Sequence, residues 1–413
     1  MSIHKIESCR VCSSSFLIPV VKLGQHCLHG QFPEDKDPDP VSMPIEVVRC
    51  PACGLVQSLY YCDPVHHFSK GYGYRSGISN TMRSHLTALA EEASTMVLNK
   101  VAPRVLDIAC NDGFLLNAIP FGTGVRVGID PSDVPVEHPG ISFINGFFPD
   151  AMLLTQKFDL ITSIACFYSV PDPVAFAKAV KSILNRDGVW VCEVADLYSV
   201  LQNVAYDFWC AEHLTLISPF SMSEIARRAE LKIVRAEPNK CNGGSMRYYL
   251  THRTNGEYEG DIRFEAWSGQ VAFLVNHART LKTDVAAYDR FANSIDRSKK
   301  QLIEAITKVR AANGTVHTLG ASTKLNVVLQ SCGLDHRVIE MASDRDPRKV
   351  GKVTPGTRIP IVSEEESRSH RPNLYLTILP FVGEILAREA EAGSKTPICF
   401  ALPWPVIKEP QKH

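Results

Sequence analysis

The chain has 413 residues, of which 45% are hydrophobic, so it is long enough for two or three domains with apolar cores of their own. Lysine and arginine total 44, as do aspartate and glutamate, and this zero net charge gives no support to a nucleic-acid or membrane-surface partner. No apolar run reaches the roughly 18 residues of a spanning helix, and the N-terminal sequence lacks the features of a signal peptide. We therefore expect a cytoplasmic protein that binds neither nucleic acid nor a membrane.

Two C-x-x-C pairs near the N-terminus predict a metal site. The chain has 13 cysteines and no secretory signal, which favours reduced thiols, some of them metal ligands, over a disulfide framework. Each pair points two thiolates at one ion, and the second pair completes a tetrahedral site without an open coordination position. We expect one structural zinc ion, rather than a redox or catalytic metal, on Cys9, Cys12, Cys50 and Cys53.

Strands and helices alternate from residue 101 onward. An apolar strand over 105–109 is followed by a tight turn and by a helix that begins near Gly113, and a second strand ends at Asp130. The sequences FDLITSIACF and GVWVCEV predict two more strands with a helix between them. This alternation predicts an α/β fold with a doubly wound parallel sheet, whose ligand lies at the carboxyl ends of the strands.

The same order resembles that of class I S-adenosylmethionine methyltransferases. The first motif of that family is acidic-x-Gly-x-Gly-x-Gly; here the chain reads DIACNDG and keeps the last glycine alone. The resemblance implies that the cofactor is held by Asp107, Asn111, Asp112 and Gly113. Asp130 suits the two ribose hydroxyls, because a carboxylate can accept both hydrogen bonds. The G-x-G-x-x-G sequence of an NAD-binding domain is absent from this turn.

Four further stretches make the resemblance more specific. They are YGYRSGISNTMRSHL (72–86), AYDFWCAEHLTLIS (205–218), CNGGSMRYY (241–249), and GASTKLNVV with DRDPRKVGKVTPGTRIPI (320–328 and 344–361). Together with the cysteine pairs they resemble, over nearly the whole chain, the sugar C-methyltransferases that act on nucleotide-linked 4-keto-deoxysugars. The resemblance implies a zinc-binding domain over 1–70, a methyltransferase core over 71–255, and a helical connector with a Rossmann-like nucleotide-sugar domain over 256–413.

The stretch FWCAEHLTLIS places Glu212 beside His213. The resemblance implies that His213 is the general base, which removes the proton next to the ketone so that the enolate carbon attacks the sulfonium methyl group. Imidazole titrates in the right range for this step, and a neighbouring carboxylate can fix its tautomer. Ala211 and Ser169 stand where relatives carry additional histidines. Tyr168 could fill part of that gap, although a packing role is equally expected.

Other polar positions are candidate contacts to the sugar. Tyr72 and Tyr74 could line the sugar pocket, although core packing is the commoner role of such a tyrosine pair. The turn of Asn242, Gly243, Gly244 and Ser245 contains glycines that let backbone amides approach a ligand, and the alternative is a plain loop. Arg247 could reach a phosphate or a sugar hydroxyl.

A second βα turn is the candidate site for the nucleotide diphosphate. The sequence GASTK follows the apolar strand VHTL and opens a helix, which together form an anion site from backbone N–H groups and a lysine. The resemblance assigns this region to the diphosphate, with Ser322, Lys324 and Asn326 as its contacts. Residues 256–312 carry apolar positions at spacings of three and four, which predicts the helical connector.

The leading hypothesis is a C-methyltransferase that uses S-adenosylmethionine and makes a branched-chain deoxysugar on a nucleotide carrier. A sugar O-methyltransferase is the nearest alternative, because a histidine base would serve there too. An NAD-dependent epimerase or dehydratase is a further alternative, but this chain lacks the intact dinucleotide-binding fingerprint that would support it. A non-catalytic zinc- or nucleotide-binding protein is the remaining alternative, and zero net charge argues against its nucleic-acid form.

Overall fold

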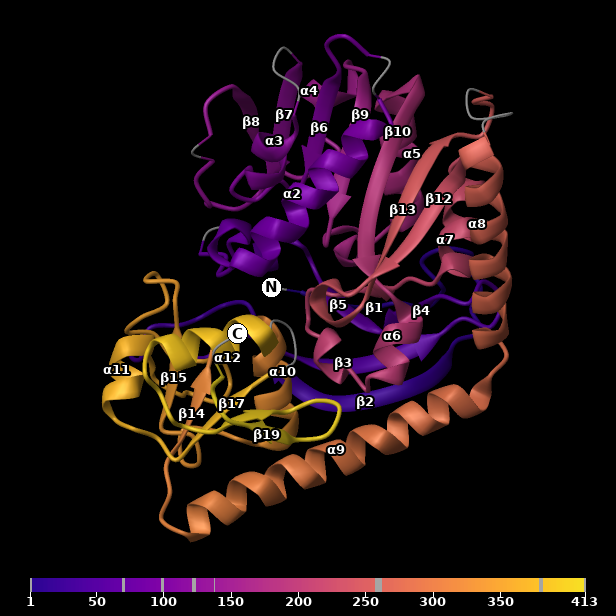
Figure 1. Ribbon diagram of the computed structural model, residues 1–413. Coiled ribbons are helices and arrows are strands. Elements are labelled where there is room, and N and C mark those ends of the chain that lie inside the picture. Colours follow the sequence, from indigo (N-terminus) through magenta and orange to yellow (C-terminus); the bar gives the residue numbers. More distant parts are fainter. Residues whose placement is uncertain are drawn as a thin grey trace.

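The computed structural model contains three larger β-sheets and a short two-stranded one (Figure 1), and its largest cluster of buried apolar residues draws on all three larger sheets. None of the helices in the described part of the chain combines the length and the apolar composition needed to cross a bilayer. The structure describes residues 2–68, 71–97, 100–120, 124–136, 138–256, 262–378 and 382–411.

The N-terminal part is built on an antiparallel sheet of four strands in the order β11-β4-β3-β2. A separate two-stranded sheet pairs β1 with β5, and the helix α1 follows β5 in the chain. Strand β11 comes from the segment that carries the Glu-His pair, so this sheet joins residues that are far apart in the sequence. The bounds are β1 Ile3–Lys5, β2 Ile18–Cys27, β3 Ser42–Arg49, β4 Val56–Ser58, β5 Tyr60–Cys62, α1 Val65–Phe68 and β11 Thr215–Leu216.

The middle of the chain forms a seven-stranded sheet in the order β12-β13-β10-β9-β6-β7-β8. Five strands run parallel, and β13 is antiparallel to both of its neighbours. The predicted doubly wound sheet is therefore confirmed, with an antiparallel strand near one edge. The bounds are β6 Arg104–Ile108, β7 Val125–Asp130, β8 Ile141–Asn145, β9 Phe158–Ile164, β10 Leu184–Ala195, β12 Leu231–Asn239 and β13 Ser245–His252.

Both faces of this sheet are covered by helices, which explains why its strands are continuous apolar runs. Val105 and Leu160 face α2, whereas Leu106 and Trp190 face α5. Helix α5 starts at the predicted turn, where the Asp172 side chain accepts a hydrogen bond from the first turn. The bounds are η1 Ser76–Ile78, α2 Asn80–Thr95, α3 Phe114–Ala118, α4 Ala151–Leu154, η2 Phe167–Ser169, α5 Pro173–Ile183, α6 Leu197–Gln202, η3 Tyr206–Phe208, α7 Pro219–Arg228 and η4 Cys241–Gly243.

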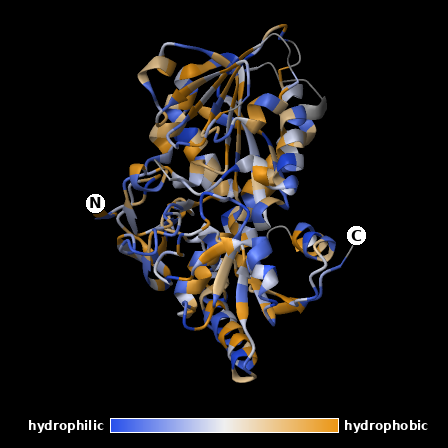
Figure 2. Ribbon diagram, turned by 90° about the vertical axis from the view of Figure 1, so that its left-hand side faces the viewer, coloured by the Kyte–Doolittle hydropathy of each residue, from blue (hydrophilic) through white to orange (hydrophobic). Residues whose placement is uncertain are grey.

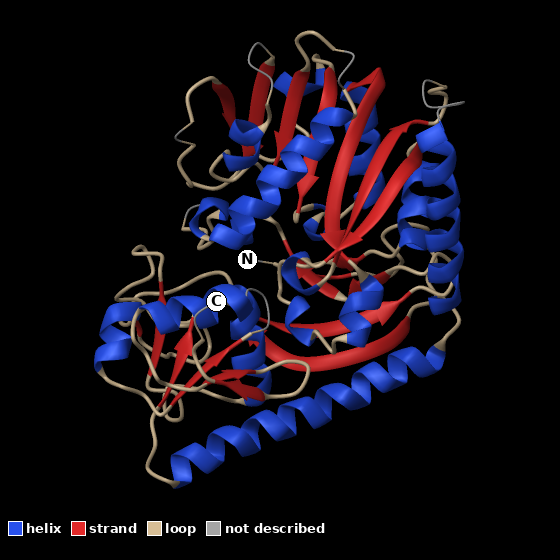
Figure 3. Cartoon of the chain, viewed as in Figure 1, coloured by secondary structure: helices blue, strands red, loops and turns tan. Residues whose placement is uncertain are grey.

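Two long helices, α8 (Ile262–Leu281) and α9 (Val285–Ala311), follow the seven-stranded sheet and lead to the C-terminal sheet (Figure 3). Buried positions in α9 recur every three or four residues, as the apolar spacing predicted: Tyr288, Phe291, Ile295, Ser298, Leu302 and Ile306.

The C-terminal part is a six-stranded sheet in the order β16-β15-β14-β17-β18-β19, in which only β19 is antiparallel to its neighbour. This order reverses at β14 in the manner of a doubly wound fold. The bounds are β14 Val316–Leu319, α10 Thr323–Cys332, β15 Met341–Asp344, β16 Ile361–Ser363, α11 Glu364–Ser369, β17 Leu374–Thr377, α12 Val382–Glu391, β18 Ile398–Phe400 and β19 Val406–Lys408.

The three sheets share one hydrophobic core. Ile45 of the N-terminal sheet, Trp190 of the seven-stranded sheet and Leu325 of α10 belong to the same cluster of buried residues. Figure 2 shows the hydrophobic residues concentrated on the central strands. Helix α10 contacts both β2 and η3, so the C-terminal part packs directly on the other two.

Candidate active site

The cofactor turn is built where β6 ends. Ala109 and Asn111 both adopt positive φ angles, 61° and 51°, so β6 stops at Ile108, one residue earlier than expected. The backbone N–H of Asn111 donates to Asp130 Oδ2 (2.9 Å), and the hydroxyl of Ser132 donates to Oδ1 (2.5 Å). The turn and the end of β7 are therefore tied together at the carboxyl edge of the sheet.

The side chains of Asn111 and Asp112 hold the segment that follows residue 72. Asn111 Nδ2 donates to the carbonyl of Tyr74 (3.1 Å), and Asp112 Oδ2 accepts from the N–H of Gly77 (2.8 Å). The other oxygen of Asp112 accepts from Phe114 N (3.3 Å), and neither Asp112 nor Gly113 lines the pocket. Asp112 thus bonds the segment 72–78 and Gly113 is the N-cap of α3, and a cofactor contact of these two residues stays a prediction.

A pocket opens between this turn and the segment 72–78. Asp107, Asn111 and Asp130 line it from the turn, while Tyr72 and Tyr74 line it from that segment. Four further lining residues follow β8 and β9 and were not predicted, because no motif marks them in the sequence; they are Gly146, Phe147, Phe148 and Cys166.

The charges in this pocket fit S-adenosylmethionine, which carries a sulfonium and an ammonium group. Burial raises the pKa of Asp107 to about 7, the hydrogen bond from Thr162 lowers it, and the nearby carboxylates of Asp130 and Asp112 raise it. A cationic ligand offsets such a concentration of buried acids. Asp130 keeps a free lone pair for a ribose hydroxyl, since its two oxygens accept three hydrogen bonds in all.

The four N-terminal cysteines form the predicted cluster. The sulfur atoms of Cys9 and Cys53 lie 3.5 Å apart, those of Cys12 and Cys50 lie 3.4 Å apart, and all four lie within 4.8 Å of one another. Zn–S bonds of about 2.3 Å in a tetrahedron require S–S separations of about 3.8 Å. The cluster therefore fits one zinc ion with four thiolates and no open position.

His213 lies in a turn with one ring nitrogen committed to the backbone. Its Nδ1 is 2.6 Å from the carbonyl oxygen of Phe208. A carbonyl can only accept, so Nδ1 carries the hydrogen and Nε2 of the neutral ring is an acceptor. The ring packs edge-on against Tyr168, with centroids 4.4 Å apart, and beside Phe208 at 4.7 Å. The tautomer is thus fixed by a backbone carbonyl and not by Glu212.

The environment of His213 keeps its imidazole neutral. Burial lowers the pKa of His213 to about 3, and the positive charge of Lys324 lowers it further, whereas the bond to Phe208 raises it. The imidazole is therefore unprotonated at neutral pH, and an anionic substrate beside it would raise its pKa and so make it a stronger base.

Glu212 is buried, and its neighbours come from residue 30 and from α10. Gly30 and Thr323, the first residue of α10, lie beside this side chain. A Cβ built on Gly30 would be 3.4 Å from Glu212 Oε1 and 3.8 Å from the Thr323 hydroxyl. Burial raises the pKa of Glu212 to about 7, and bonds from its own N–H, Cys210 and Thr323 lower it. Its Oε2 has no hydrogen-bond partner among the described residues.

The three candidate tyrosines differ in what surrounds them. Burial raises the pKa of Tyr72 well above its usual range, and the charge of Glu212 adds to that shift. Burial raises the pKa of Tyr168 in the same way, with a contribution from Tyr72. Tyr72 and Tyr74 thus line the pocket, whereas Tyr168 packs against the ring of His213.

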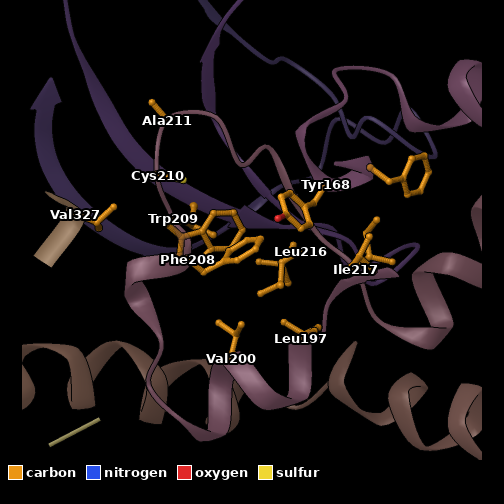
Figure 4. Close-up of a cluster of buried hydrophobic side chains, with 14 of the residues drawn as sticks. Tyr168, Leu197, Val200, Phe208, Trp209, Cys210, Ala211, Leu216, Ile217 and Val327 are labelled. Carbon is orange, nitrogen blue, oxygen red and sulfur yellow. The ribbon is translucent and has the colours of Figure 1, made fainter. Parts of the chain in front are cut away.

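Most residues of the stretch 205–218 are buried in the core. Figure 4 shows Phe208, Trp209, Cys210 and Ala211 packed among apolar side chains, with Val327 of α10 alongside. These four residues are at most 2% exposed. The Glu-His pair is therefore held in a rigid turn rather than on a solvated surface.

Arg247 is engaged with carboxylates. Its Nε donates to Glu193 (2.9 Å) and its Nη1 to Glu92 (2.6 Å), while His85 bonds the other oxygen of Glu193 (2.6 Å). Arg247 is 7% exposed. The structure therefore gives Arg247 a role in tying α2 to the sheet and does not place it for a phosphate.

In the turn after β12, one position is a glycine because a neighbouring side chain leaves no room for a Cβ. A Cβ on Gly244 would lie 2.4 Å from Ser199 Cβ, and Gly244 has a φ of 125°. Asn242 and Gly243 also have positive φ angles, and Ser245 bonds the carbonyl of Cys241 (3.1 Å). The glycines thus shape a tight hairpin, and Gly244 is explained by its neighbour in α6 rather than by a ligand.

The second βα turn meets this hairpin. Lys324 Nζ donates to the carbonyl of Asn242 (3.1 Å), and Ser322 caps α10 by accepting from Leu325 N. Asn326 is fully buried and donates to the carbonyl of His29 (2.7 Å), so it is a contact between domains rather than an exposed ligand group. Of the three candidates in this turn, Lys324 lies close enough to His213 to affect its pKa. Ser322 and Asn326 bond to other parts of the protein.

Comparisons with known proteins find relatives for each part of the chain. Family models match the chain in order: "Putative zinc binding domain" over 9–68, "Methyltransferase domain" over 74–236, and "C-methyltransferase C-terminal domain" over 240–403. The C-methyltransferase NovU of Streptomyces niveus is 26% identical over 401 residues, which cover 94% of this chain and 93% of the relative. A ubiquinone biosynthesis O-methyltransferase of Actinobacillus pleuropneumoniae is 30% identical over 100 residues, which cover 21% of this chain and 43% of the relative.

Solved structures of methyltransferases match part of the chain. An S-adenosylmethionine-dependent methyltransferase from Clostridium acetobutylicum is 15% identical with a TM-score of 0.34, and the match covers 43% of this chain and 93% of that one. The magnesium protoporphyrin IX methyltransferase of Synechocystis, solved with bound S-adenosylmethionine, is 13% identical with a TM-score of 0.33, covering 43% of this chain and 87% of that one.

The family models account for all three parts of the chain in their order, and the first relative aligns over nearly its full length. The chain belongs to the S-adenosylmethionine-dependent C-methyltransferases that join a zinc-binding N-terminal domain to a class I methyltransferase core and a C-terminal domain of their own.

Proposed function

We propose that this enzyme methylates a carbon atom of a nucleotide-linked 4-keto-deoxysugar, next to the ketone, and so makes a branched-chain sugar. The observation that carries the proposal is the fixed tautomer of His213, whose Nδ1 donates to a backbone carbonyl and whose Nε2 is left to accept a proton. A ketone makes the adjacent C–H acidic enough for such a base.

The proposed proton step uses residues of this chain alone. His213 Nε2 takes the proton from the carbon beside the ketone, and the electron pair of that C–H bond forms the enolate. The enolate oxygen requires hydrogen-bond donors, and Tyr72 and Tyr168, whose raised pKa values keep their hydroxyls protonated, are the donors near the Glu-His pair. S-adenosylmethionine, when bound, supplies a methyl group that a carbanion can displace from sulfur.

We further propose a division of labour among the three parts. Asp107, Asn111 and Asp130 hold the cofactor, and Lys324 binds an oxygen of the nucleotide diphosphate. Lys324 fits this role because its charge reaches His213 and its Nζ already lies against the hairpin at Asn242. Domains 1–70, 71–255 and 256–413 remain the proposed boundaries.

The decisive experiment incubates the enzyme with a panel of nucleotide-linked keto-deoxysugars and methyl-labelled S-adenosylmethionine, followed by mass spectrometry and NMR of the product. We expect one added methyl group on carbon. A methyl group on oxygen would establish the sugar O-methyltransferase instead.

A second measurement separates the two chemistries without methyl transfer. In deuterated solvent and without S-adenosylmethionine, the enzyme should exchange the hydrogen next to the ketone of its true substrate, because enolisation alone causes this exchange. An enzyme that methylates but never exchanges this hydrogen above the uncatalysed rate would contradict the enolate mechanism.

A further inference from the structure

The backbone on both sides of His213 is held by the N-terminal domain. After His213, the N–H of Ser58 donates to the carbonyl of Leu214 (2.9 Å), and β11 pairs with β4. Before His213, the N–H of Ala211 donates to Nδ1 of His29 (3.2 Å). The turn that carries the base is therefore enclosed between two sets of contacts from residues 29–58.

The bond from Ala211 differs from its neighbours in the turn. The N–H groups of Cys210, His213 and Leu214 donate to backbone carbonyls, those of Phe208, Cys210 and Tyr168 respectively. The N–H of Ala211 instead donates to a side chain that lies 182 residues away in the sequence. The backbone at this point has its geometry set by the imidazole of His29.

A chain of hydrogen bonds fixes the tautomer of His29. Because Ala211 N–H donates to Nδ1, the hydrogen of the neutral ring lies on Nε2, which faces Nδ1 of His26 at 3.0 Å. His26 then carries its hydrogen on Nε2, toward the hydroxyl of Ser331 in α10 (3.4 Å). A protonated His29 would carry a hydrogen on Nδ1 as well, and this hydrogen would face the N–H of Ala211. The observed hydrogen bond therefore requires a neutral ring.

His29 is fully buried, as is His26 at 1% exposure, so neither imidazole can reach a substrate. The carbonyl of His29 accepts from Asn326 (2.7 Å), and the next residue, Gly30, lies against Glu212. His29 thus connects the N-terminal domain, the catalytic turn and α10 at one point. Burial lowers the pKa of His29 well below its usual range, in agreement with a neutral ring.

We propose that His29 is a positioning residue, through which the N-terminal domain sets the backbone that aims the His213 imidazole. The inference rests on the proposed function for the role of His213 as base. A displacement of about 1 Å in a reacting group can cost on the order of 10²-fold in rate. This assignment gives the zinc-binding domain a part in catalysis, although it supplies no group to the reaction.

Two substitutions at His29 test the proposal. His29→Asn places an amide oxygen near the position of Nδ1 and retains an acceptor for Ala211, whereas His29→Leu removes it. We expect kcat for methyl transfer to fall roughly 10- to 10²-fold in His29→Leu and to stay within about threefold of wild type in His29→Asn, with KM and cofactor affinity little changed. Equal kcat in wild type and His29→Leu would overturn the proposal, as would an equal loss in both variants.

His252→Leu is the matched control. His252 Nε2 bonds the carbonyl of Leu184 (3.1 Å), so this variant also removes an imidazole bonded to the backbone. Leu184 begins β10 and therefore lies at the end of the sheet opposite the carboxyl edge. We expect full activity, and a loss as large as that of His29→Leu would show a general effect of destabilisation and refute the assignment.

A spectroscopic measurement keeps the test independent of activity. In protein labelled with ¹⁵N-histidine, we expect His29 to show the Nε2–H tautomer without titration from pH 6 to 8, and His213 to show the Nδ1–H tautomer. In a folded His29→Leu variant, the His213 signals should shift or broaden. An Nδ1–H tautomer at His29, or an unchanged His213 signal in His29→Leu, would overturn the positioning role, whereas failure of deuterium exchange in the wild type would count against the proposed function alone.

Discussion

The cofactor turn (residues 104–130) and the turn that carries the proposed base (residues 205–218, called the catalytic turn below) reach their positions in different ways. The cofactor turn is held by its own sheet: Ala109 N–H bonds the carbonyl of Ile129 (2.8 Å), and Asn111 N–H bonds Asp130. The catalytic turn is held by contacts from other parts of the chain, among them His29 and Ser58. The comparison teaches that a binding turn can be specified by adjacent strands, whereas the backbone around His213, the proposed base, is held by residues of the N-terminal part.

The largest expected effect separates the two turns by their chemistry. His213→Asn keeps the approximate shape of the side chain but cannot accept the proton at a useful rate, so methyl transfer should fall by roughly 10²- to 10⁴-fold. Cofactor affinity, measured by calorimetry, should stay unchanged, because the pocket lies on the other turn. A variant that still exchanges the substrate hydrogen at the wild-type rate would remove His213 from the mechanism.

Asp130→Ala tests the cofactor turn. It removes the acceptor for the ribose and also the partner of Asn111 N–H, and the loss of a charged hydrogen-bond partner costs about 1.5–3 kcal/mol. Calorimetry should therefore show cofactor affinity reduced by tenfold or more, with the ¹⁵N-histidine signal of His213 unchanged. Wild-type affinity would mean that the ribose is held by other residues.

Loss of the metal should damage the catalytic turn more than the cofactor turn. Cys50→Ser should lower the zinc content from about one equivalent and loosen the domain that carries His29 and Ser58, so methyl transfer should fall roughly tenfold while cofactor affinity is retained. Cys27→Ser, in the same domain but outside the cluster, is the control. Full zinc content in Cys50→Ser would disprove the ligand assignment.

Lys324→Ala tests whether the C-terminal domain contributes substrate affinity. The loss of one charged contact should raise KM for the nucleotide-sugar roughly five- to tenfold and leave cofactor affinity alone. Lys308→Ala, on the exposed side of α9, is the matched control and should have no effect. A parallel fall in both affinities would contradict the proposed separation of the two sites.

The smallest expected effect concerns stability in acid. The pKa of His213 is about 3 in the folded protein and 6.5 in an ordinary environment, so the unfolded chain binds more protons and the wild type loses stability as pH falls from 6.5 toward 3. His213→Asn lacks this group, so its free energy of unfolding in urea should fall less between pH 7 and 5, by on the order of 1 kcal/mol. Parallel pH dependences would show that this histidine titrates normally.

Turn chemistry and strand order explain why parts of the site could be predicted. Two C-x-x-C loops define a tetrahedral cluster, and the four sulfur atoms do converge. The alternation of apolar runs predicted the order of β6, β7, β9 and β10, and with it the place of Asp130 at the end of β7. These features depend on residues that are close in sequence or on neighbouring strands, where local geometry leaves few alternatives.

Side-chain partners were not predictable in the same way. Asp112 accepts a hydrogen bond from Gly77, and Arg247 pairs with Glu193. Ser199 leaves no room for a Cβ at Gly244. Each partner lies on an element that is distant in sequence, and the residue type alone does not state whether a carboxylate or a guanidinium faces a ligand or another side chain.

The sequence by itself determined the doubly wound sheets, the metal-binding thiols and the family, because periodicity, turn residues and motif order are properties of the chain. Only the tertiary structure decided how His213 is aimed. Its tautomer depends on a carbonyl five residues away, its backbone on His29 and β4, and its pKa on burial and on Lys324. Hydrogen-bond direction and desolvation are set by which atoms surround a group, and packing brings those atoms from all three parts of the chain.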